Sequence, residues 1–413
     1  MRAAAFVYPW DVVGDPDAPR RLRDLGVQQV TLASAYHSTR ALTPRHPRHR
    51  VVTARHSAVL YRPDPAHWAG SRLRPYEQRW VTGDDPGGPY AEAARALTGA
   101  GLTVHSWVVL AHNSRLGEDF PSVTIRNAYG DQYPWAPCVA RPEVREYAVA
   151  LAAEAAVRPD TRGTELESCG WYGLAHLHAH DKTGGVPLDG AGQYLMSLCF
   201  CEVCRAGYAA LDADPEELRA AVVRALAPLW SGAPSAGGGP GRAGEWAEVC
   251  ELLGSATAEV FATWRGRSAR RLRREAMAAV RAAAAARDEG ANDFRVLLHA
   301  DPAPHRAGAN AGVDPAEAVE DADGVVLPCA GGAAERAAVL GPFAAAAGAA
   351  GSGGFTVAAN FPVVAGMGGS PGTLASDAAH ARELGAGEVR LYHAGLASDA
   401  DLRAVRAALA ARL

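Results

Sequence analysis

Short runs of apolar residues alternate along the chain with longer stretches rich in alanine, leucine and arginine. The apolar runs have the length expected of buried strands, and stretches that follow them, such as Pro142–Ala156 and Ser376–Leu384, show a helical pattern. Eight strands are predicted in this way: Ala3–Tyr8, Gln29–Ala35, Thr103–Leu110, Thr164–Ser168, Arg295–His299, Gly324–Pro328, Thr356–Asn360 and Glu388–Tyr392. The repeat of strand, loop and helix predicts parallel strands joined by crossover helices.

Eight strand–helix units within 413 residues are typical of a closed barrel. The fold predicted for residues 1–413 is therefore of the α/β class, a single (β/α)8 TIM barrel with insertions after strands 2 and 4. The alternative is an open, doubly wound sheet, because the hydrophobic pattern predicts strands but not whether the sheet closes.

Two long segments interrupt the regular order of strands and helices. The first insertion, residues 39–90, includes an additional strand predicted within Arg55–Arg62. The second insertion, residues 170–290, holds a histidine-rich loop, a cysteine cluster and long helices. Residues 231–244 within it are rich in glycine and proline, so they are predicted to form a flexible loop rather than a domain boundary.

The composition narrows the class of protein. Hydrophobic residues make up 48% of the chain and charged residues 21%, so a large core can form. The formal net charge of −4 gives no general attraction to nucleic acids or anionic membranes. The arginine-rich run between Arg40 and Arg62 is interpreted as a solvated part of the first insertion. Because no secretory signal or membrane-spanning pattern is found, we expect a cytoplasmic protein without a membrane partner; homo-oligomerisation is left open.

Functional side chains of such a barrel lie where the strands end and the following loops begin. The sequence places the following aromatic, histidine, amide, acidic and small polar residues there: Tyr8, Trp10, Tyr36, His37, Trp107, His112, Asn113, Glu165, Glu167, Ser168, His299, Asp301, Cys329, Asn360, Tyr392 and His393. Aromatic rings pack against the apolar faces of sugars, and polar groups between them bind the hydroxyls. The expected ligand is therefore a carbohydrate or glycoside.

Glu167 is the best candidate for a catalytic residue. It lies near the end of the strand Thr164–Ser168 and shares a face with Glu165, because side chains alternate along a strand. Burial raises the pKa of a carboxyl group, which suits a general acid. The alternative for either glutamate is an ion pair with an arginine inside the barrel. Asp301 is the nearest candidate for a second carboxylate, acting as a base to water or stabilising an oxocarbenium-like transition state.

Three histidines, His176, His178 and His180, occupy alternate positions after the fourth strand. In an extended loop all three would project to one side, where they could bind a substrate or a metal. The alternative is a polar loop without a ligand. We expect at least one of them to face the site, and His178 is taken as the representative substrate-binding position.

The cysteines Cys199, Cys201 and Cys204 have the spacing C-x-C-x₂-C. Thiolates this close repel one another unless a cation shares them, and zinc is the usual cation in the cytoplasm. Cys138 is the best candidate for the fourth ligand. Four sulfur ligands leave zinc no open position, so its role would be structural. The alternative is a set of reduced, metal-free thiols.

A family resemblance rests on three features in this order: the Cys-x₃-Pro-Glu-x-Arg segment beginning at Cys138, the strand bearing Glu167, and the C-x-C-x₂-C motif. Together they resemble the glycoside hydrolase family 42 β-galactosidases over about residues 130–205 and in the barrel layout. The resemblance implies a four-cysteine zinc cluster and an acid/base role for Glu167. The family nucleophile is a glutamate ending the seventh strand, where this chain has Asn360, and Leu166 stands where the family has asparagine.

Three functions follow as hypotheses. The first is hydrolysis of a glycosidic bond with Glu167 as the general acid/base. The second is a catalytically inactive carbohydrate-binding or regulatory barrel, which the missing seventh-strand glutamate favours. The third is a metal-dependent hydrolase or isomerase that uses His112, His299, His393 and Asp301, although no H-E-x-x-H motif occurs in the sequence.

Overall fold

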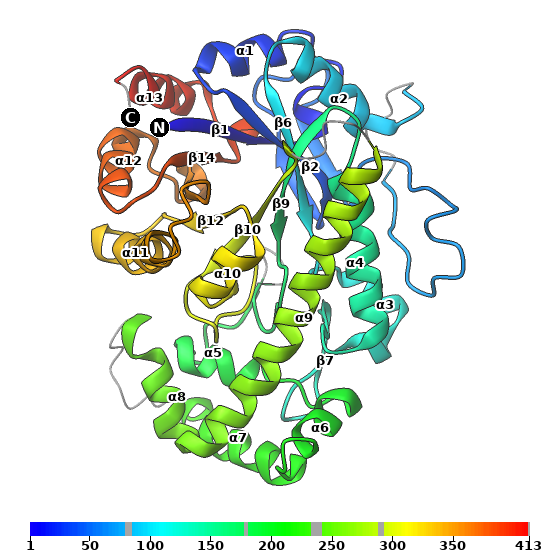
Figure 1. Ribbon diagram of the computed structural model, residues 1–413, viewed down its shortest axis with the longest axis vertical. Coiled ribbons are helices and arrows are strands. Elements are labelled where there is room, and N and C mark those ends of the chain that lie inside the picture. The colour runs from blue at the N-terminus through cyan, green and yellow to red at the C-terminus, as the bar shows by residue number, and fades with distance from the viewer. Residues whose placement is uncertain (79–84, 177–180, 233–241, 288–292, 412–413) are drawn as a thin grey trace.

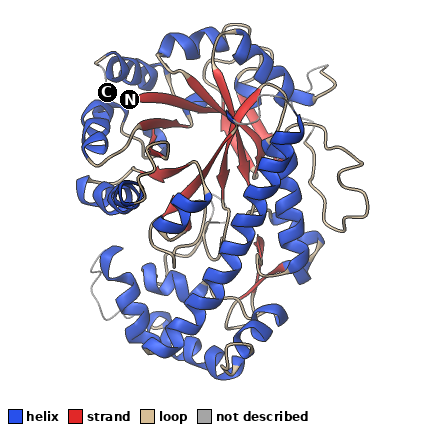
Figure 2. Cartoon of the chain, in the orientation of Figure 1, coloured by secondary structure: helices blue, strands red, loops and turns tan. Residues whose placement is uncertain are grey.

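The computed structural model describes residues 1–78, 85–176, 181–232, 242–287 and 293–411. Eight parallel strands form the centre of the molecule, and helices surround them (Figures 1 and 2). The barrel strands are β1 (Arg2–Val7), β2 (Gln29–Tyr36), β6 (Thr103–Val109), β9 (Thr161–Glu167), β10 (Arg295–Asp301), β12 (Gly324–Pro328), β13 (Thr356–Pro362) and β14 (Glu388–Tyr392). These match the eight predicted strands to within a few residues.

The sheet closes on itself because β1 pairs with both β14 and β2. Ala4 lies opposite Arg390 on one side and opposite Gln29 on the other. The remaining neighbours follow in the order β14, β13, β12, β10, β9, β6 and β2, all parallel. The predicted closed barrel is therefore confirmed, and the open sheet is excluded.

The sequence explains why the barrel strands are buried on both faces. All eight residues of β2 are buried, from Gln29 to Tyr36, as expected for a parallel strand covered by helices outside and side chains inside. The covering helices have clear end signals. Helix α1 (Ala18–Leu25) ends at Gly26, which adopts a left-handed φ of 103°, and Ser398 caps α13 (Asp399–Ala410).

The helices follow the strands around the barrel and also form a separate group beside it. Besides α1 and α13 they are α2 (Gly88–Gly99), α3 (Ser114–Asp119), α4 (Pro142–Ala156), α5 (Gly190–Met196), α6 (Glu202–Ala209), α7 (Pro215–Trp230), α8 (Glu245–Leu253), α9 (Ser255–Arg287), α10 (Pro315–Asp321), α11 (Ala333–Ala349) and α12 (Leu374–Glu383). Helices α5 to α8 gather at one end of the molecule, and the long α9 runs from them back along α4 to the barrel (Figure 1). No helix in the described ranges is long and apolar enough to cross a membrane.

Short strands outside the barrel build two hairpins. Between β2 and β6, β3 (Thr39–Leu42) pairs antiparallel with β4 (Val51–Ala54). The strand predicted within Arg55–Arg62 is only the two residues of β5 (Ala58–Val59), which pairs antiparallel with the end of β2. The second hairpin consists of β7 (Thr124–Arg126) and β8 (Gln132–Pro137), which pair antiparallel. The remaining short strand, β11 (Ala311–Gly312), pairs parallel with β10. Most of the predicted flexible loop, residues 233–241, lies outside the described residues.

Candidate active site

A cavity of about 1250 Å³ opens at the carboxyl ends of the barrel strands. Its barrel-side lining consists of aromatic and histidine residues together with one glutamate, namely Tyr8, Tyr36, His37, Glu167, Tyr172, His176, Tyr392 and His393. These residues come from the ends of β1, β2, β9 and β14 and from the loops that follow. Of these, Tyr8, Tyr36, His37, Glu167, Tyr392 and His393 are predicted strand-end positions, and His176 belongs to the histidine-rich loop.

Other predicted site residues lie behind the cavity wall rather than on it. Trp10 stacks on Tyr8 with ring centroids 4.3 Å apart, and His112 stacks on Tyr172 at 4.2 Å. Asn113 caps α3 by accepting a hydrogen bond from the backbone of Leu116. These side chains position the lining instead of forming it. The predicted positions that are buried outside the lining are Trp10, Trp107, His112, Asn113, His299, Asp301 and Asn360. His178 lies outside the described residues.

Glu167 is the buried carboxyl group that faces this cavity. Its side chain is 3% exposed, and the indole Nε1 of Trp107 donates a hydrogen bond of 2.8 Å to its Oε2. Burial raises the pKa of Glu167 above its ordinary value, while His299 and the hydrogen bond from Trp107 oppose that rise. A carboxyl group in this setting holds a proton at a higher pH than an exposed glutamate does.

Glu165, two residues earlier on the same face of β9, has a different environment. Its Oε1 accepts hydrogen bonds from Arg390 at 2.8 Å and from Thr31 at 3.1 Å, and the residue is fully buried. Burial would raise the pKa of Glu165, but the Arg390 guanidinium overcomes this effect and holds the pKa at about 2. The alternative of an ion pair inside the barrel therefore applies to Glu165. Arg390, on β14, was not identified from the sequence.

The barrel interior thus has two levels. The lower level contains buried polar residues around Glu165, namely Gln29, Thr31, His105 and Arg390. The upper level contains aromatic rings beside Glu167. Phe6 packs edge-on against Trp107, His299 and Tyr392, and Trp107 in turn donates the hydrogen bond to Glu167. His299 lies between the levels, with Nε2 3.7 Å from Glu165 Oε2 and Nδ1 3.9 Å from Glu167 Oε2.

Burial keeps the imidazoles of His37, His112 and His393 neutral near pH 7. Burial lowers the pKa of His37 to about 4 and that of His393 to about 3. Burial also lowers the pKa of His112. Neutral imidazoles can donate and accept hydrogen bonds but provide no positive charge. His393 already uses its Nδ1 in a contact of 2.9 Å with the Tyr8 hydroxyl, which fixes both rings at the cavity edge.

Asp301 is not brought together with Glu167. It is buried at the end of β10, where its carboxylate pairs with Arg242 and accepts a hydrogen bond from the backbone of Ala303 at 2.9 Å. It is absent from the cavity lining. The other carboxylate that lines the cavity is Asp401, which is engaged with Ser398 in the cap of α13.

Two walls of the cavity come from segments that the sequence did not assign to the site. The β3–β4 hairpin contributes residues between Thr39 and Arg55, and the loop after β13 contributes residues 364–367. Tyr172 also lines the cavity, five residues beyond Glu167. The aromatic pair Trp171–Tyr172 directly after the fourth strand was a signal that could have identified Tyr172.

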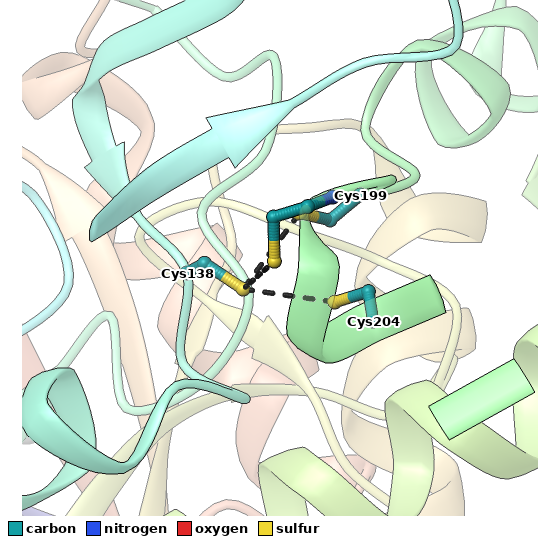
Figure 3. Close-up of side chains that lie close together, drawn as sticks. Cys138, Cys199 and Cys204 are labelled. Carbon is teal, nitrogen blue, oxygen red and sulfur yellow. Dashed lines mark hydrogen bonds between the residues drawn. The ribbon is translucent and has the colours of Figure 1, made fainter. Parts of the chain in front are cut away.

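The four predicted cysteines converge away from this cavity (Figure 3). The Sγ atom of Cys138 lies 3.7 Å from each of the Sγ atoms of Cys199, Cys201 and Cys204. All four residues are buried, and their sulfur atoms lie within 4.8 Å of one another. A tetrahedral site with zinc–sulfur bonds of about 2.3 Å separates the sulfurs by about 3.8 Å. The cluster thus has the composition and size of a four-sulfur metal site.

The cluster joins two segments that are far apart in the sequence. Cys138 directly follows β8 and precedes α4, whereas Cys199 and Cys201 lie just before α6 and Cys204 lies in its first turn. Backbone contact reinforces the junction, since the amide of Phe200 donates to the carbonyl of Arg126. In the described part of the chain, no second group of histidine, cysteine or acidic residues is close enough to hold a metal. The set His112, His299, His393 and Asp301 is therefore not assembled as a metal centre.

No protein-family model matches the sequence, and no curated protein matches it in sequence. Solved structures of similar fold are the α-L-fucosidase isoenzyme 2 from Paenibacillus thiaminolyticus (TM-score 0.54, 13% identity), a β-galactosidase from the psychrophilic Marinomonas ef1 (0.52, 11%) and the PgaB (BpsB) glycoside hydrolase domain from Bordetella bronchiseptica (0.52, 15%). The alignments cover 99%, 100% and 98% of this chain.

The chain spans 49% of the fucosidase, 60% of the β-galactosidase and 97% of the PgaB domain. At these identities the similarity establishes the fold, and all three proteins are named as glycosidases. The barrel of this chain is therefore one that glycoside hydrolases use.

Proposed function

We propose that this protein is a glycoside hydrolase-like enzyme in which Glu167 is the general acid/base. The observation that carries the proposal is a buried carboxyl group of raised pKa at the end of β9, facing a large cavity lined with aromatic rings. A general acid needs to hold its proton near the working pH, and burial shifts the pKa of Glu167 in that direction. The tyrosines of the lining supply ring faces and hydroxyls for a sugar.

The finer proposal is a distant relation to the family 42 β-galactosidases. It is supported by the order of the cysteine segment, the Glu167 strand and the C-x-C-x₂-C motif, and by the convergence of the four cysteines. Galactosides, and fucosides because of the fucosidase neighbour, are the first substrates to test.

The expected second carboxylate, Asp301, does not line the cavity beside Glu167. To act on the substrate beside Glu167, Asp301 would have to leave Arg242. Asn360 lies two residues before the end of β13, so within the described residues the usual double displacement, which needs two carboxyl groups about 5–5.5 Å apart, lacks a glutamate on this strand. This observation favours the second candidate function, a carbohydrate-binding barrel without catalysis.

The test compares Glu167→Gln with wild type on 2,4-dinitrophenyl and methyl galactosides and fucosides. If Glu167 is the acid, the methyl glycosides lose about 10²–10⁴-fold in rate, whereas the dinitrophenyl glycosides, whose leaving group needs no proton, lose little. The matched control is Glu118→Gln, a change of an exposed glutamate on α3. Equal loss on both leaving groups would refute the acid role. A wild-type protein that binds these sugars but cleaves none would establish the binding barrel.

We also propose that the four cysteines hold one structural zinc ion. Zinc suits a closed set of four thiolates, and the cluster lies away from the cavity, so the metal would stabilise the fold rather than react. Metal analysis of the purified protein should find one zinc per chain, and Cys138→Ser should abolish zinc binding and lower the melting temperature. Protein purified without any metal would contradict this assignment.

A further inference from the structure

The mouth of the cavity, defined by its exposed lining residues, includes apolar side chains from two segments of the chain, β3 and the loop after β13. In the described part of the chain, five large hydrophobic side chains are exposed: Leu42, Val51, Tyr129, Trp230 and Met367. Leu42, on β3, is 66% exposed, and Met367, after β13, is 54% exposed, and both line the cavity that contains Glu167. Val51, 57% exposed, lies directly opposite Leu42 in the β3–β4 pair.

The other two exposed residues have an evident partner. Tyr129 and Trp230 pack against each other edge-on, with ring centroids 5.6 Å apart, and the indole donates to the tyrosine hydroxyl at 2.6 Å. Exposed apolar side chains that gather around one opening indicate a binding surface more strongly than scattered ones do. Of the remaining three, Leu42 and Met367 line the cavity, and Val51 is paired with Leu42 in the β3–β4 hairpin.

The side of the mouth that bears Leu42 is held in place. Arg45, in the turn of the β3–β4 hairpin, donates hydrogen bonds to the carbonyl groups of Ala397 and Gly395 in the loop after β14. His46 in the same turn contacts the carbonyl of Val13 at 2.9 Å. A hairpin tied at its tip to two other barrel loops presents Leu42 without first becoming ordered, which lowers the cost of binding.

The cavity continues from the mouth to Glu167 with an apolar wall. Between the two ends its lining includes Ala41, Pro44, Ala54, Val364, Ala365 and Leu396. Its volume of about 1250 Å³ exceeds the 300–1,000 Å³ or so that drug-sized ligands occupy, so a single sugar ring at Glu167 would leave the mouth side empty. The lining combines these apolar side chains with tyrosines and histidines and with polar residues such as Arg40, Arg55 and Asp401.

We propose that the substrate is a glycoside with an extended apolar aglycone, which lies between Leu42 and Met367 while the sugar lies beside Glu167. This inference rests on the proposed function. In this arrangement the leaving group is the apolar one: Glu167 protonates the glycosidic oxygen, the bond from that oxygen to the anomeric carbon breaks, and the aglycone departs as an alcohol through the mouth. Water supplies the hydroxyl of the released sugar.

The test measures binding as well as turnover, so that its failure is distinct from failure of the proposed function. Methyl, butyl, hexyl and octyl β-D-galactosides, and the same series of β-D-glucosides, are titrated below their micelle concentrations into the Glu167→Gln protein by calorimetry. Affinity should rise by about two- to fourfold per methylene group, because each buried methylene contributes a fixed apolar area. The same dependence should appear in the kcat/KM values of the wild-type protein.

Two variants locate the effect. Leu42→Ser and Met367→Ser remove apolar surface from exposed positions, so the fold should persist. In these variants the affinity should depend much less on the length of the alkyl chain. Trp230→Ser, which removes an equally exposed side chain on α7, should keep the full gain. Absence of chain-length dependence in the Glu167→Gln protein would overturn the proposal even if short glycosides are cleaved. It would also be overturned if Leu42→Ser and Met367→Ser dissociate a dimer in sedimentation yet leave the chain-length dependence intact.

Discussion

The two levels of the barrel interior place carboxyl groups of the same strand in opposite electrostatic environments. At the lower level Glu165 is neutralised by Arg390 and by hydroxyl and amide donors, and its pKa is held at about 2. At the upper level Glu167 has rings around it and one indole donor, and burial raises its pKa. Two positions on one strand thus carry a carboxylate in a buried ion pair and a carboxyl group whose pKa is raised by burial.

The difference also sets opposite responses to pH. The pKa of Glu165 is lower in the folded than in the unfolded protein, so its contribution to stability is complete above about 4.5 and is lost as the pH falls toward about 2. The pKa of Glu167 is higher in the folded protein, so stability is lost as the pH rises above its unfolded value. Glu165 at the lower level therefore contributes most to stability at neutral pH, whereas Glu167 at the upper level reduces stability at that pH.

The largest effect is expected from Arg390→Met, which leaves Glu165 buried without its cation. Removing one partner of a buried ion pair costs about 3–5 kcal/mol in the free energy of unfolding. Urea unfolding at pH 7 measures this loss. Arg20→Met is the matched control, since the Arg20–Asp17 pair is exposed and exposed ion pairs contribute little to stability. Equal losses in the two variants would remove the distinction between the levels.

Replacing both partners should recover much of that loss. In Glu165→Leu/Arg390→Met neither charge remains, so the double variant should be more stable than the sum of the single changes predicts, by about 2–3 kcal/mol. The coupling free energy from a double-mutant cycle gives the value. Additive losses would show that Glu165 and Arg390 stabilise the barrel independently.

Glu167→Gln should raise the free energy of unfolding, whereas the single change Arg390→Met at the lower level should lower it. At pH 7 the variant should be more stable than wild type, by an amount on the order of 1 kcal/mol, because it removes a buried carboxyl group that resists ionisation. The difference should vanish below pH 4.5, where the wild-type carboxyl group is protonated in both states. Thermal unfolding between pH 4 and 8 measures it, and a destabilised variant would place Glu167 with Glu165 as a structural residue.

The smallest effect is expected at the cavity wall. Tyr36→Phe removes one hydroxyl from the upper level, which should change the free energy of unfolding by at most about 1 kcal/mol. Loss of one hydrogen bond to the sugar should weaken binding by about fivefold, measured as KM or by calorimetry. A larger loss in stability than in binding would mean that this ring belongs to the core and not to the site.

The strands of the barrel could be predicted because each is a short apolar run with a clear end, as in β2. The ends of the strands also identified Tyr8, Tyr36, Tyr392 and Glu167, since their place on the carboxyl side follows from strand direction alone. The choice between Glu165 and Glu167 could not be made from the sequence. It depends on Arg390, 225 residues away, which reaches Glu165 only after the barrel closes.

The same physical limit explains why the pairing of Asp301 and the exposed residues of the cavity mouth could not be predicted from the sequence. The pairing of Asp301 with Arg242 joins β10 to a segment between α7 and α8, and no local pattern indicates it. The exposed Leu42 and Met367 come from different loops, which meet across the cavity only in three dimensions. The cysteine cluster was easier to predict, because three cysteines within six residues already limit the geometry. Only Cys138, the fourth member, had to be inferred from its context.

The cysteine cluster also has a consequence for the entropy of the unfolded chain. Cys138 and Cys199 are 61 residues apart, and the loop between them contains α4 and the strand that carries both Glu165 and Glu167. A cross-link that closes a loop of this length lowers the conformational freedom of the unfolded state by an amount worth about 4 kcal/mol, by analogy with a disulfide. A metal that stays bound during unfolding would thus restrict the conformations that the strand bearing Glu165 and Glu167 samples before it returns to the sheet.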